Sequence, residues 1–229
     1  MAALRAVGGC RGVPPPRQSR GVAEGLLQRL GRWISEVEPV ATWGERRRRN
    51  RLQRQNAYCG VLRDTYGDNV VAATFTLSCG GGVRFEGQEH WLRPEDEWQP
   101  QVLHLRDVPV VALDLSGSPL TYNGLDNLVR LTRLQHLDLS GCPHLDDWAL
   151  GRLHVFGDTL RELSVARCPR VTERGLATLH HLRLLRRLDV AGLRVPSPGL
   201  VRILLEEALP HCHILGDNEG TPPPPQPPP

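Results

Sequence analysis

Apolar residues in the second half of the chain, residues 110–215, recur in an order that repeats four times. Each copy contains the pattern L-x-x-L-x-L or a close variant of it. The central column consists of Leu113, Leu137, Leu163 and Leu188, which are 24, 26 and 25 residues apart. The chain therefore repeats one unit, and a repeat of this length indicates a single supersecondary element that is copied along the chain.

Within each unit the apolar spacing changes from that of a strand to that of a helix. Leu137 and Leu139 are two residues apart, as on one face of a strand. The segment after them has helical spacing at Leu145, Trp148, Ala149 and Leu153. A strand that returns through a helix with a period in the twenties is typical of the leucine-rich repeat. Because one unit cannot bury its apolar face alone, we predict an α/β fold, a short solenoid of about four cysteine-type repeats with parallel strands and return helices.

The residues after each strand predict how the unit turns. Cys142 and Cys168 stand three residues past the strand, at a column that repeats of this type bury. Four residues later come side chains that can accept a hydrogen bond from the first turn of the next helix, namely Asp146, Thr172 and Ser197. Pro198 then occupies a position that helices tolerate.

Residues 25–109 are predicted to form a small α+β region that caps the first repeat. Residues 25–40 have apolar side chains at three- and four-residue spacing, as on one face of a helix. The segment VVAATFTLS, residues 70–78, has the composition of a strand, and a glycine-rich turn and a second strand, VRF, follow it. This pattern predicts a β-hairpin. Because the end of a solenoid exposes apolar core, we expect these elements to cover it.

The two ends of the chain have the composition of unpacked segments. Residues 1–24 contain four arginines and no acid before Glu24, which is typical of a mitochondrial presequence. The glycines and the run Pro14–Pro16 interrupt a helix, so a disordered tail is the alternative interpretation. Residues 217–229 are rich in proline, which predicts an extended polyproline II tail without a packed core.

Charge is unevenly distributed along the chain. All 28 basic residues are arginine, and residues 1–54 carry a formal charge of +8 whereas the remainder carries −5. A run from Arg46 to Arg54 can meet nucleic-acid phosphates or anionic lipid. It contains little aromatic interleaving for base stacking, so a solvated helix face is the simpler interpretation.

The residues that usually carry chemistry form no recognisable site. The six cysteines include no C-x-x-C pair and have no histidine at metal-ligand spacing, which is typical of free thiols in a reducing compartment. No nucleophile elbow, P-loop, dinucleotide fingerprint or H-E-x-x-H occurs. The longest apolar run, residues 70–77, is too short to cross a bilayer. We therefore expect no enzyme, cofactor, metal site or transmembrane segment.

What remains is a surface for a protein partner. On a strand, the residues between the buried leucines point to the opposite side, which is the concave side of a solenoid. The candidate protein-binding residues on that side are Asp114, His136, Asp138, Glu162, Ser164, Arg187 and Asp189. Asp114 and Asp138 fall side by side on neighbouring strands, where like charges repel. An arginine from a partner can offset that repulsion; a hydrated acidic face is the alternative.

Several segments resemble one known family. They include YNGLDNLVRL (Tyr122–Leu131), HLDDWALGRL (His144–Leu153), LRELSVARCPRVTERGLATLHHL (Leu160–Leu182) and GLVRILLEEALPHC (Gly199–Cys212). GGVRF and HWLRP, before the repeats, are similar to the same family. The chain thus resembles distal membrane-arm assembly component 2, a family also described as ATP synthase subunit s-like and similar to coupling factor B.

The resemblance implies a non-enzymatic mitochondrial protein, in the matrix or peripheral at the matrix side of the inner membrane. Its implied role is assembly of the distal membrane arm of respiratory complex I (NADH:ubiquinone oxidoreductase), with membrane-arm subunits and other assembly factors as partners. The alternative is a substrate-recognition subunit of a ubiquitin ligase or another leucine-rich repeat adaptor. That alternative requires a three-helix segment before the repeats, where the sequence predicts a hairpin. Nucleic-acid binding through Arg46–Arg54 is the weakest hypothesis, and we expect no nucleic-acid partner.

Overall fold

The computed structural model describes residues 43–58, 60–94 and 105–216. The predicted presequence, the predicted helix at residues 25–40 and the proline-rich tail lie outside these residues. The chain divides into two compact units, Met1–Asn50 and Arg51–Pro229. In the first unit, the described residues 43–50 are helical, and the helix continues to residue 55.

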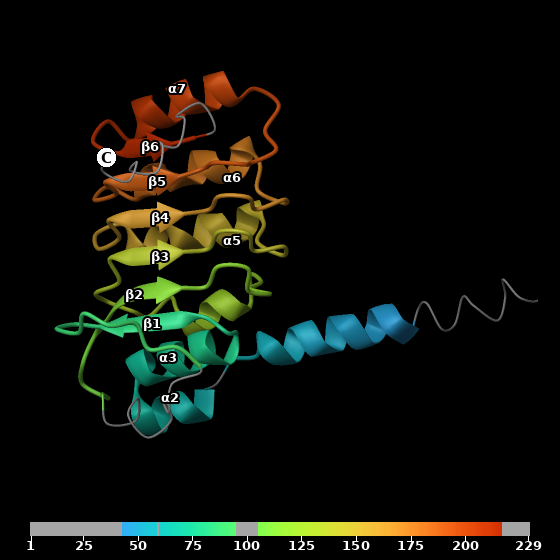
Figure 1. Cartoon of the computed structure of the whole chain (residues 1–229), viewed down its shortest axis with the longest axis vertical. Coiled ribbons are helices and arrows are strands. Elements are labelled where there is room, and N and C mark those ends of the chain that lie inside the picture. The colour runs from blue at the N-terminus through green and yellow to red at the C-terminus, as the bar shows by residue number, and fades with distance from the viewer. Residues whose placement is uncertain (1–42, 59, 95–104, 217–229) are drawn as a thin grey trace, which may run out of the picture. The chain divides into compact units, whose positions relative to one another are not determined.

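The second unit is built around one six-stranded sheet whose spatial order follows the sequence (Figure 1). Its strands are β1 (Gly82–Phe85), β2 (Val110–Asp114), β3 (His136–Asp138), β4 (Glu162–Ser164), β5 (Arg187–Asp189) and β6 (His213–Leu215). Each strand from β2 to β6 is parallel to its neighbour, whereas β1 is antiparallel to β2. The predicted α/β class is confirmed.

The leucine column seen in the sequence forms a straight row across the parallel strands. Leu113 pairs with Leu137, Leu137 with Leu163, and Leu163 with Leu188. Ile214 of β6 extends the row, because it pairs with Leu188. All five side chains are buried. The spacing of about 25 residues is thus the length of chain needed to leave the sheet and return one strand further on.

Short helices connect the strands and lie behind the sheet (Figure 1). They are α5 (Asp147–Gly151), α6 (Glu173–Ala177), α7 (Pro198–Ala208) and the 3-10 helices η1 (Gly124–Asn127), η2 (Arg152–Phe156) and η3 (Thr178–His181). Leu145, Ala149 and Leu153 face the core as predicted. Trp148 does not, because it is 80% exposed. The prediction for Trp148 was wrong because α5 is a single turn and a half, and only one stripe of so short a helix meets the sheet.

Side-chain caps were predicted at the start of α5, α6 and α7, and two of these three helices have the predicted cap. The Asp146 carboxylate accepts a hydrogen bond from the Ala149 N–H (2.9 Å), and the Thr172 hydroxyl accepts one from the Arg174 N–H (3.3 Å). Ser197 makes no such bond with its side chain, so that prediction was wrong. Pro198 is the first residue of α7, as predicted. Its ring already presets a helical φ at this position, which favours helix initiation without a side-chain cap.

Each thiol of the cysteine column links the turn after its own strand to the end of the preceding strand in the sheet. The Cys142 thiol donates to the carbonyl of Leu115 (3.2 Å), and the Cys168 thiol donates to the carbonyl of Leu139 (3.1 Å). Both cysteines are fully buried, as predicted. Each side chain therefore satisfies a carbonyl at a strand end where the backbone leaves the sheet.

The predicted hairpin in the capping region was wrong. Residues 70–77 lie in helix α3 (Asp68–Ser78), which follows α2 (Gly60–Tyr66). A short continuous apolar run fits a buried strand and a buried helix equally well, since neither shows a polar face. Here α3 is buried on most sides, and the Thr76 hydroxyl bonds back to the Ala72 carbonyl within the helix (2.8 Å). The partner of β1 is β2 rather than residues 70–77.

Asn56 attaches the start of the second unit to the first repeat. Its amide nitrogen donates to the carbonyls of Leu52 and Pro119, at 2.9 Å each, and its amide oxygen accepts from the Thr121 N–H (2.9 Å). A Cβ on Gly124 would collide with the Asn56 side chain, so glycine is required there. The buried Asn56 therefore holds residues 52–56 against the loop after β2.

Candidate functional site

The candidate site is the open strand face, defined here as the side of the sheet opposite the helices α5, α6 and α7. Two rows of side chains run across it, because residues on either side of each buried leucine point the same way. The first row is Ala112, His136, Glu162, Arg187 and His213; the second is Asp114, Asp138, Ser164, Asp189 and Leu215. All seven residues predicted to bind a partner therefore lie in these rows.

The aspartates of the second row have a local structural role. One carboxylate oxygen of each accepts a hydrogen bond from the backbone N–H two residues later: Asp114 from Ser116 (3.1 Å), Asp138 from Ser140 (2.8 Å) and Asp189 from Ala191 (3.0 Å). This is the hydrogen bond by which aspartate favours turns. The repeated Asp at this row therefore shapes the exit from each strand.

Asp114 has a cationic partner within the chain. An Arg93 guanidinium nitrogen lies 3.2 Å from its second carboxylate oxygen. The sequence suggested that a partner's arginine offsets the repulsion between Asp114 and Asp138, but Arg93, which lies just after the bridge between Val83 and Leu92, supplies that charge. At Asp189, the second oxygen accepts from the Ser164 hydroxyl (3.4 Å).

The first row carries an aromatic and charged cluster, which we call the strand-face cluster: Arg84, Trp91, His136 and Glu162. The Arg84 guanidinium lies over the Trp91 ring, 5.3 Å from its centroid. The Trp91 ring meets the His136 ring edge to face at 6.0 Å. His136 Nδ1 is 2.9 Å from a Glu162 carboxylate oxygen. Both side chains of that pair are partly exposed, at 34% and 48%, so the cluster is accessible and held in place.

Sequence reasoning missed Arg84, Trp91 and Arg93 as members of this face. They belong to β1 and the segment after it, which the sequence paired with residues 70–77. Gly81 permits the close approach of this segment to β2, because a Cβ there would collide with the Asp114 carbonyl. The motif HWLRP was visible in the sequence, but its position beside β2 and β3 depends on antiparallel pairing that no local pattern indicates.

The described residues include neither a cluster that could hold a metal ion nor a cysteine with a lowered pKa. They contain no group of three or more His, Cys, Asp or Glu side chains placed to hold a metal ion. Burial raises the pKa of the Cys142 thiol to about 12 and that of the Cys212 thiol to about 11. Because the thiolate is the reactive form, such cysteines are poor nucleophiles at neutral pH. Within the described ranges, no helix is long and apolar enough to span a membrane.

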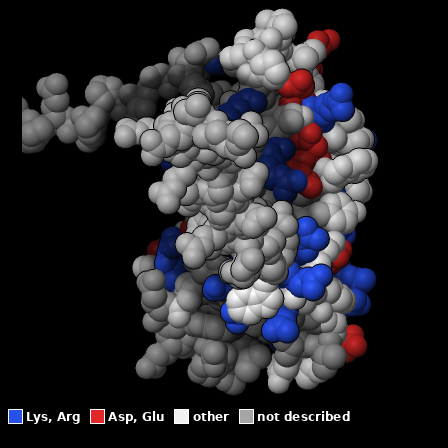
Figure 2. Space-filling view, turned by 90° about the vertical axis from the view of Figure 1, so that its right-hand side faces the viewer, with Lys and Arg blue, Asp and Glu red and all other residues white. Residues whose placement is uncertain are grey.

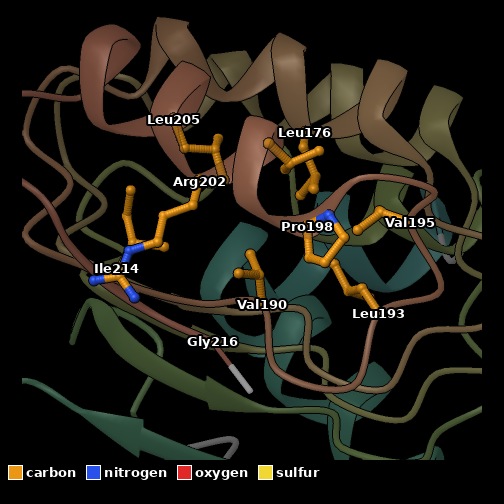
Figure 3. A pocket seen from close by; sticks show the side chains of 10 residues that line it. Leu176, Val190, Leu193, Val195, Pro198, Arg202, Leu205, Ile214 and Gly216 are labelled. Atoms are coloured by element: carbon orange, nitrogen blue, oxygen red, sulfur yellow. The ribbon is translucent and has the colours of Figure 1, made fainter. Parts of the chain in front are cut away.

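Cavities of the second unit differ in size and lining, and one of about 300 Å³ is lined by polar residues that include Arg133, Gln135 and Asp158. Another of about 120 Å³ lies beneath α7 and is lined by residues that include Val190, Leu193, Pro198, Leu205 and Arg202. Figure 3 shows that these side chains are aliphatic apart from the Arg202 guanidinium. Ligand sites usually occupy roughly 300–1,000 Å³, so this cavity is a packing gap at the end of the sheet.

Charges of both signs are spread over the second unit. On the open strand face Arg93 adjoins Asp114, and Arg187 adjoins Glu162 across β4 and β5. Figure 2 shows that arginines and carboxylates also lie next to each other on the face that it presents. A mixed surface of this kind suits a protein partner with its own pattern of charges better than a uniformly anionic polymer.

These features define an α/β protein of stacked strand–helix units with a polar, aromatic-containing strand face. No protein-family model matches the chain. It is 28% identical over 180 residues to distal membrane arm assembly component 2 of Drosophila melanogaster, which covers 77% of this chain and 63% of that protein. It is 29% identical over 164 residues to mitochondrial ATP synthase subunit s of Macaca fascicularis, covering 67% of this chain and 77% of the relative. The human ATP synthase subunit s is 30% identical over 144 residues, covering 58% of this chain and 68% of that protein.

The chain therefore belongs to the family of distal membrane arm assembly component 2 and mitochondrial ATP synthase subunit s. The resemblance seen in the sequence is confirmed. The relatives are mitochondrial proteins by name, which confirms the predicted location at that level. The chain spans less than two thirds of the Drosophila relative's length.

Proposed function

We propose that this chain is a non-enzymatic assembly factor for the distal membrane arm of respiratory complex I. In this proposal it acts in the mitochondrial matrix or at the matrix side of the inner membrane. Residues 110–216 form a leucine-rich repeat scaffold, and their open strand face binds membrane-arm subunits or other assembly factors. A relative named for distal membrane arm assembly supports the role, and the other two relatives are named as a subunit of mitochondrial ATP synthase.

The stacking of the units supports the repeat assignment. Four parallel pairings join β2 to β6 in the same register, and the leucine row lies at the centre of each. Stacked units bury a continuous core and leave their strands side by side on one face. We further propose that residues 25–109 cap the first unit, that residues 1–24 are a presequence and that residues 217–229 are a disordered tail.

The observation that carries the binding proposal is the strand-face cluster. Trp91 and Arg84 belong to residue types that dominate protein interfaces, and they stand beside His136 and Glu162 on rigid strands. The four residues contact each other on the surface rather than in the leucine core. A surface of aromatic and charged groups that are already positioned binds a partner with little loss of side-chain entropy.

A ubiquitin-ligase receptor is the second candidate, and one observation favours it. The predicted hairpin, which argued against a helical segment before the repeats, is replaced by the helices α2 and α3. The family relatives support the mitochondrial role instead. Imaging of tagged full-length chain and of a form lacking residues 1–24 separates the two. Residence of both forms in the cytosol or nucleus supports the receptor and contradicts the assembly factor.

The assembly role is tested by rescue of cells that lack the endogenous protein. The full-length chain and the triple variant His136→Ala, Glu162→Ala, Arg187→Ala are re-expressed, and native electrophoresis of mitochondrial membranes follows complex I. We expect wild type to restore the mature complex. The triple variant should accumulate normally and leave membrane-arm intermediates, because its open strand face has lost both charges and the histidine ring.

A matched control removes the same residue types elsewhere. The control variant is His211→Ala, Glu207→Ala, Arg170→Ala. The three wild-type side chains are exposed and make no hydrogen bond or ion pair among the described residues. This control should rescue fully, and thermal unfolding of both purified variants should match wild type. Full rescue by the open-face triple variant rejects that face as the binding surface. Normal complex I in cells without the protein rejects the assembly role.

A further inference from the structure

Residues 43–50 form a helix with a strong local excess of positive charge. Arg46, Arg47, Arg48 and Arg49 are consecutive, and Glu45 is the acidic residue of this stretch. In the sequence the run continues with Arg51 and Arg54. Like charges three or four residues apart on a helix repel each other, as at Arg46 and Arg49 or at Arg47 and Arg51, so this concentration of arginines lowers helix stability. A helix face that contacts only water does not require four consecutive arginines.

These arginines have no anionic partner among the described residues. Arg46, Arg48 and Arg49 are exposed and make no hydrogen bond or ion pair there. Arg47 lies over the ring of Trp43, 4.4 Å from its centroid. In the second unit, by contrast, several arginines have a carboxylate within 4 Å, as at Arg93–Asp114, Arg133–Glu86 and Arg202–Glu206. Within the part of the chain that the structure describes, no carboxylate therefore competes with an external anion for the guanidinium groups of residues 46–49.

Four successive residues on a helix point in four directions about 100° apart. On whichever side the helix meets a flat anionic layer, at least one of the four guanidinium groups faces that layer, and the long side chains of its neighbours extend toward it. A planar surface accommodates this arrangement without a fitted pocket. The spacing thus favours a sheet of headgroups over a single anionic ligand.

Trp43 distinguishes a membrane from a nucleic acid as the anionic partner. Its ring is 58% exposed and stacked against Arg47. Tryptophan is enriched at membrane interfaces, where its apolar ring and polar N–H meet different surroundings. Single-stranded nucleic acids are bound by several aromatic side chains that stack on successive bases, whereas Trp43 is the single aromatic residue among residues 43–57.

We propose that Trp43 and Arg46–Arg49 bind the headgroup layer of an anionic phospholipid membrane. This contact draws the protein to the membrane surface electrostatically, and Trp43 enters the headgroup layer. The proposal does not depend on the role in complex I assembly, because it concerns a different unit of the chain from the open strand face. Each arginine near an anionic surface strengthens binding by roughly fivefold.

Sedimentation of purified full-length protein with vesicles tests the proposal. The protein should bind vesicles that mix phosphatidylcholine with phosphatidylglycerol and should not bind phosphatidylcholine alone. Salt should weaken the binding, since exposed charges are screened. The variant Arg46→Gln, Arg47→Gln, Arg48→Gln, Arg49→Gln should bind about a hundredfold more weakly or worse. Glutamine has nearly the helix propensity of arginine, so the helix itself is preserved.

A control variant with the same change in net charge separates this helix from overall charge. It replaces exposed arginines of the second unit that make no ion pair among the described residues: Arg130→Gln, Arg170→Gln, Arg174→Gln and Arg183→Gln. This variant should bind vesicles as wild type does. Equal loss in both variants, or no loss in the first, overturns the proposal.

Two further measurements sharpen the result. Comparison of wild type with Trp43→Phe should show a blue-shifted Trp43 emission when anionic vesicles are added, as expected if the ring leaves bulk water. A duplex RNA competitor should displace the protein from vesicles only at a large excess of phosphate. Displacement by an equal phosphate concentration identifies a nucleic acid as the partner and overturns the membrane proposal.

Discussion

The middle and last units of the sheet start from the same sequence pattern and pack differently. After β3, the turn is tied to the previous strand by Cys142, and the helix begins with a hydrogen bond to Asp146. After β5, Leu193 occupies the cysteine column and is only partly buried, and Ser197 makes no cap bond. The helix that follows has eleven residues, against five in α5.

The difference follows from the number of neighbours. The unit containing β3 is covered on both sides by other units, so each of its inward side chains has a place in the leucine core. The last unit has a strand neighbour, β6, but its helix exposes three large aliphatic side chains: Leu200, Ile203 and Leu204, at 60–63%. Position in the stack, more than the residue pattern, sets how much apolar surface a unit buries.

The largest effect is expected from shortening a side chain in the leucine row. Leu137→Ala should lower the free energy of unfolding by about 2–5 kcal/mol, because Leu137 is fully buried and its loss leaves a cavity. Ile203→Ala in α7 should change it by less than about 0.5 kcal/mol, since that side chain is 60% exposed. Urea denaturation of the two variants measures the difference. Similar losses at both sites would show that α7 is covered in solution.

A smaller effect on the free energy of unfolding is expected from ionisation of Cys142, the cysteine of the unit that contains β3. Its ordinary pKa is 9.0, and burial raises the pKa of the folded Cys142 thiol to about 12. Between these values the unfolded chain loses the proton and the folded chain keeps it, so stability is complete below pH 9 and falls as the pH rises. The loss from pH 8 to pH 10 should be about 1.4 kcal/mol for this thiol.

Replacement of the thiol isolates its share of that pH dependence. Cys142→Ala should show a shallower fall in the free energy of unfolding between pH 8 and pH 10 than wild type, measured by urea denaturation at each pH. Leu193, which occupies the same column of the last unit, has no ionisable group. An equal pH dependence in wild type and Cys142→Ala would mean that the thiol ionises as easily in the folded protein as in the unfolded chain.

The smallest effect is expected at the caps. Asp146→Ala should lower the free energy of unfolding by about 1 kcal/mol, because the Ala149 N–H loses its acceptor. Ser197→Ala should be nearly neutral, since its side chain caps nothing and Pro198 already favours the start of α7. Thermal unfolding of the pair checks this order. If Ser197→Ala proved as costly as Asp146→Ala, the last helix would have a cap bond in solution like that of α5.

Local patterns predicted the repeated part of the chain well. The leucine row, the buried cysteines and the Asp146 and Thr172 caps each follow a residue spacing that is visible within one unit, and that spacing is imposed by the geometry of a strand and a helix turn. The same reasoning placed the seven candidate residues on one strand face. It overestimated Asp138 and its counterparts as partner-binding groups, because it could not show that their carboxylates bond to backbone N–H groups.

Within residues 110–215, the amino-acid order alone thus specified which residues form the strands and which of their side chains are buried, since alternation and period are properties of the backbone. Packing in three dimensions made α3 a helix, left Trp148 exposed and brought Arg84, Trp91 and Arg93 beside β2 and β3. Those outcomes arise from contacts between residues far apart in the chain. Burial on several sides and antiparallel pairing leave no periodic trace in the sequence.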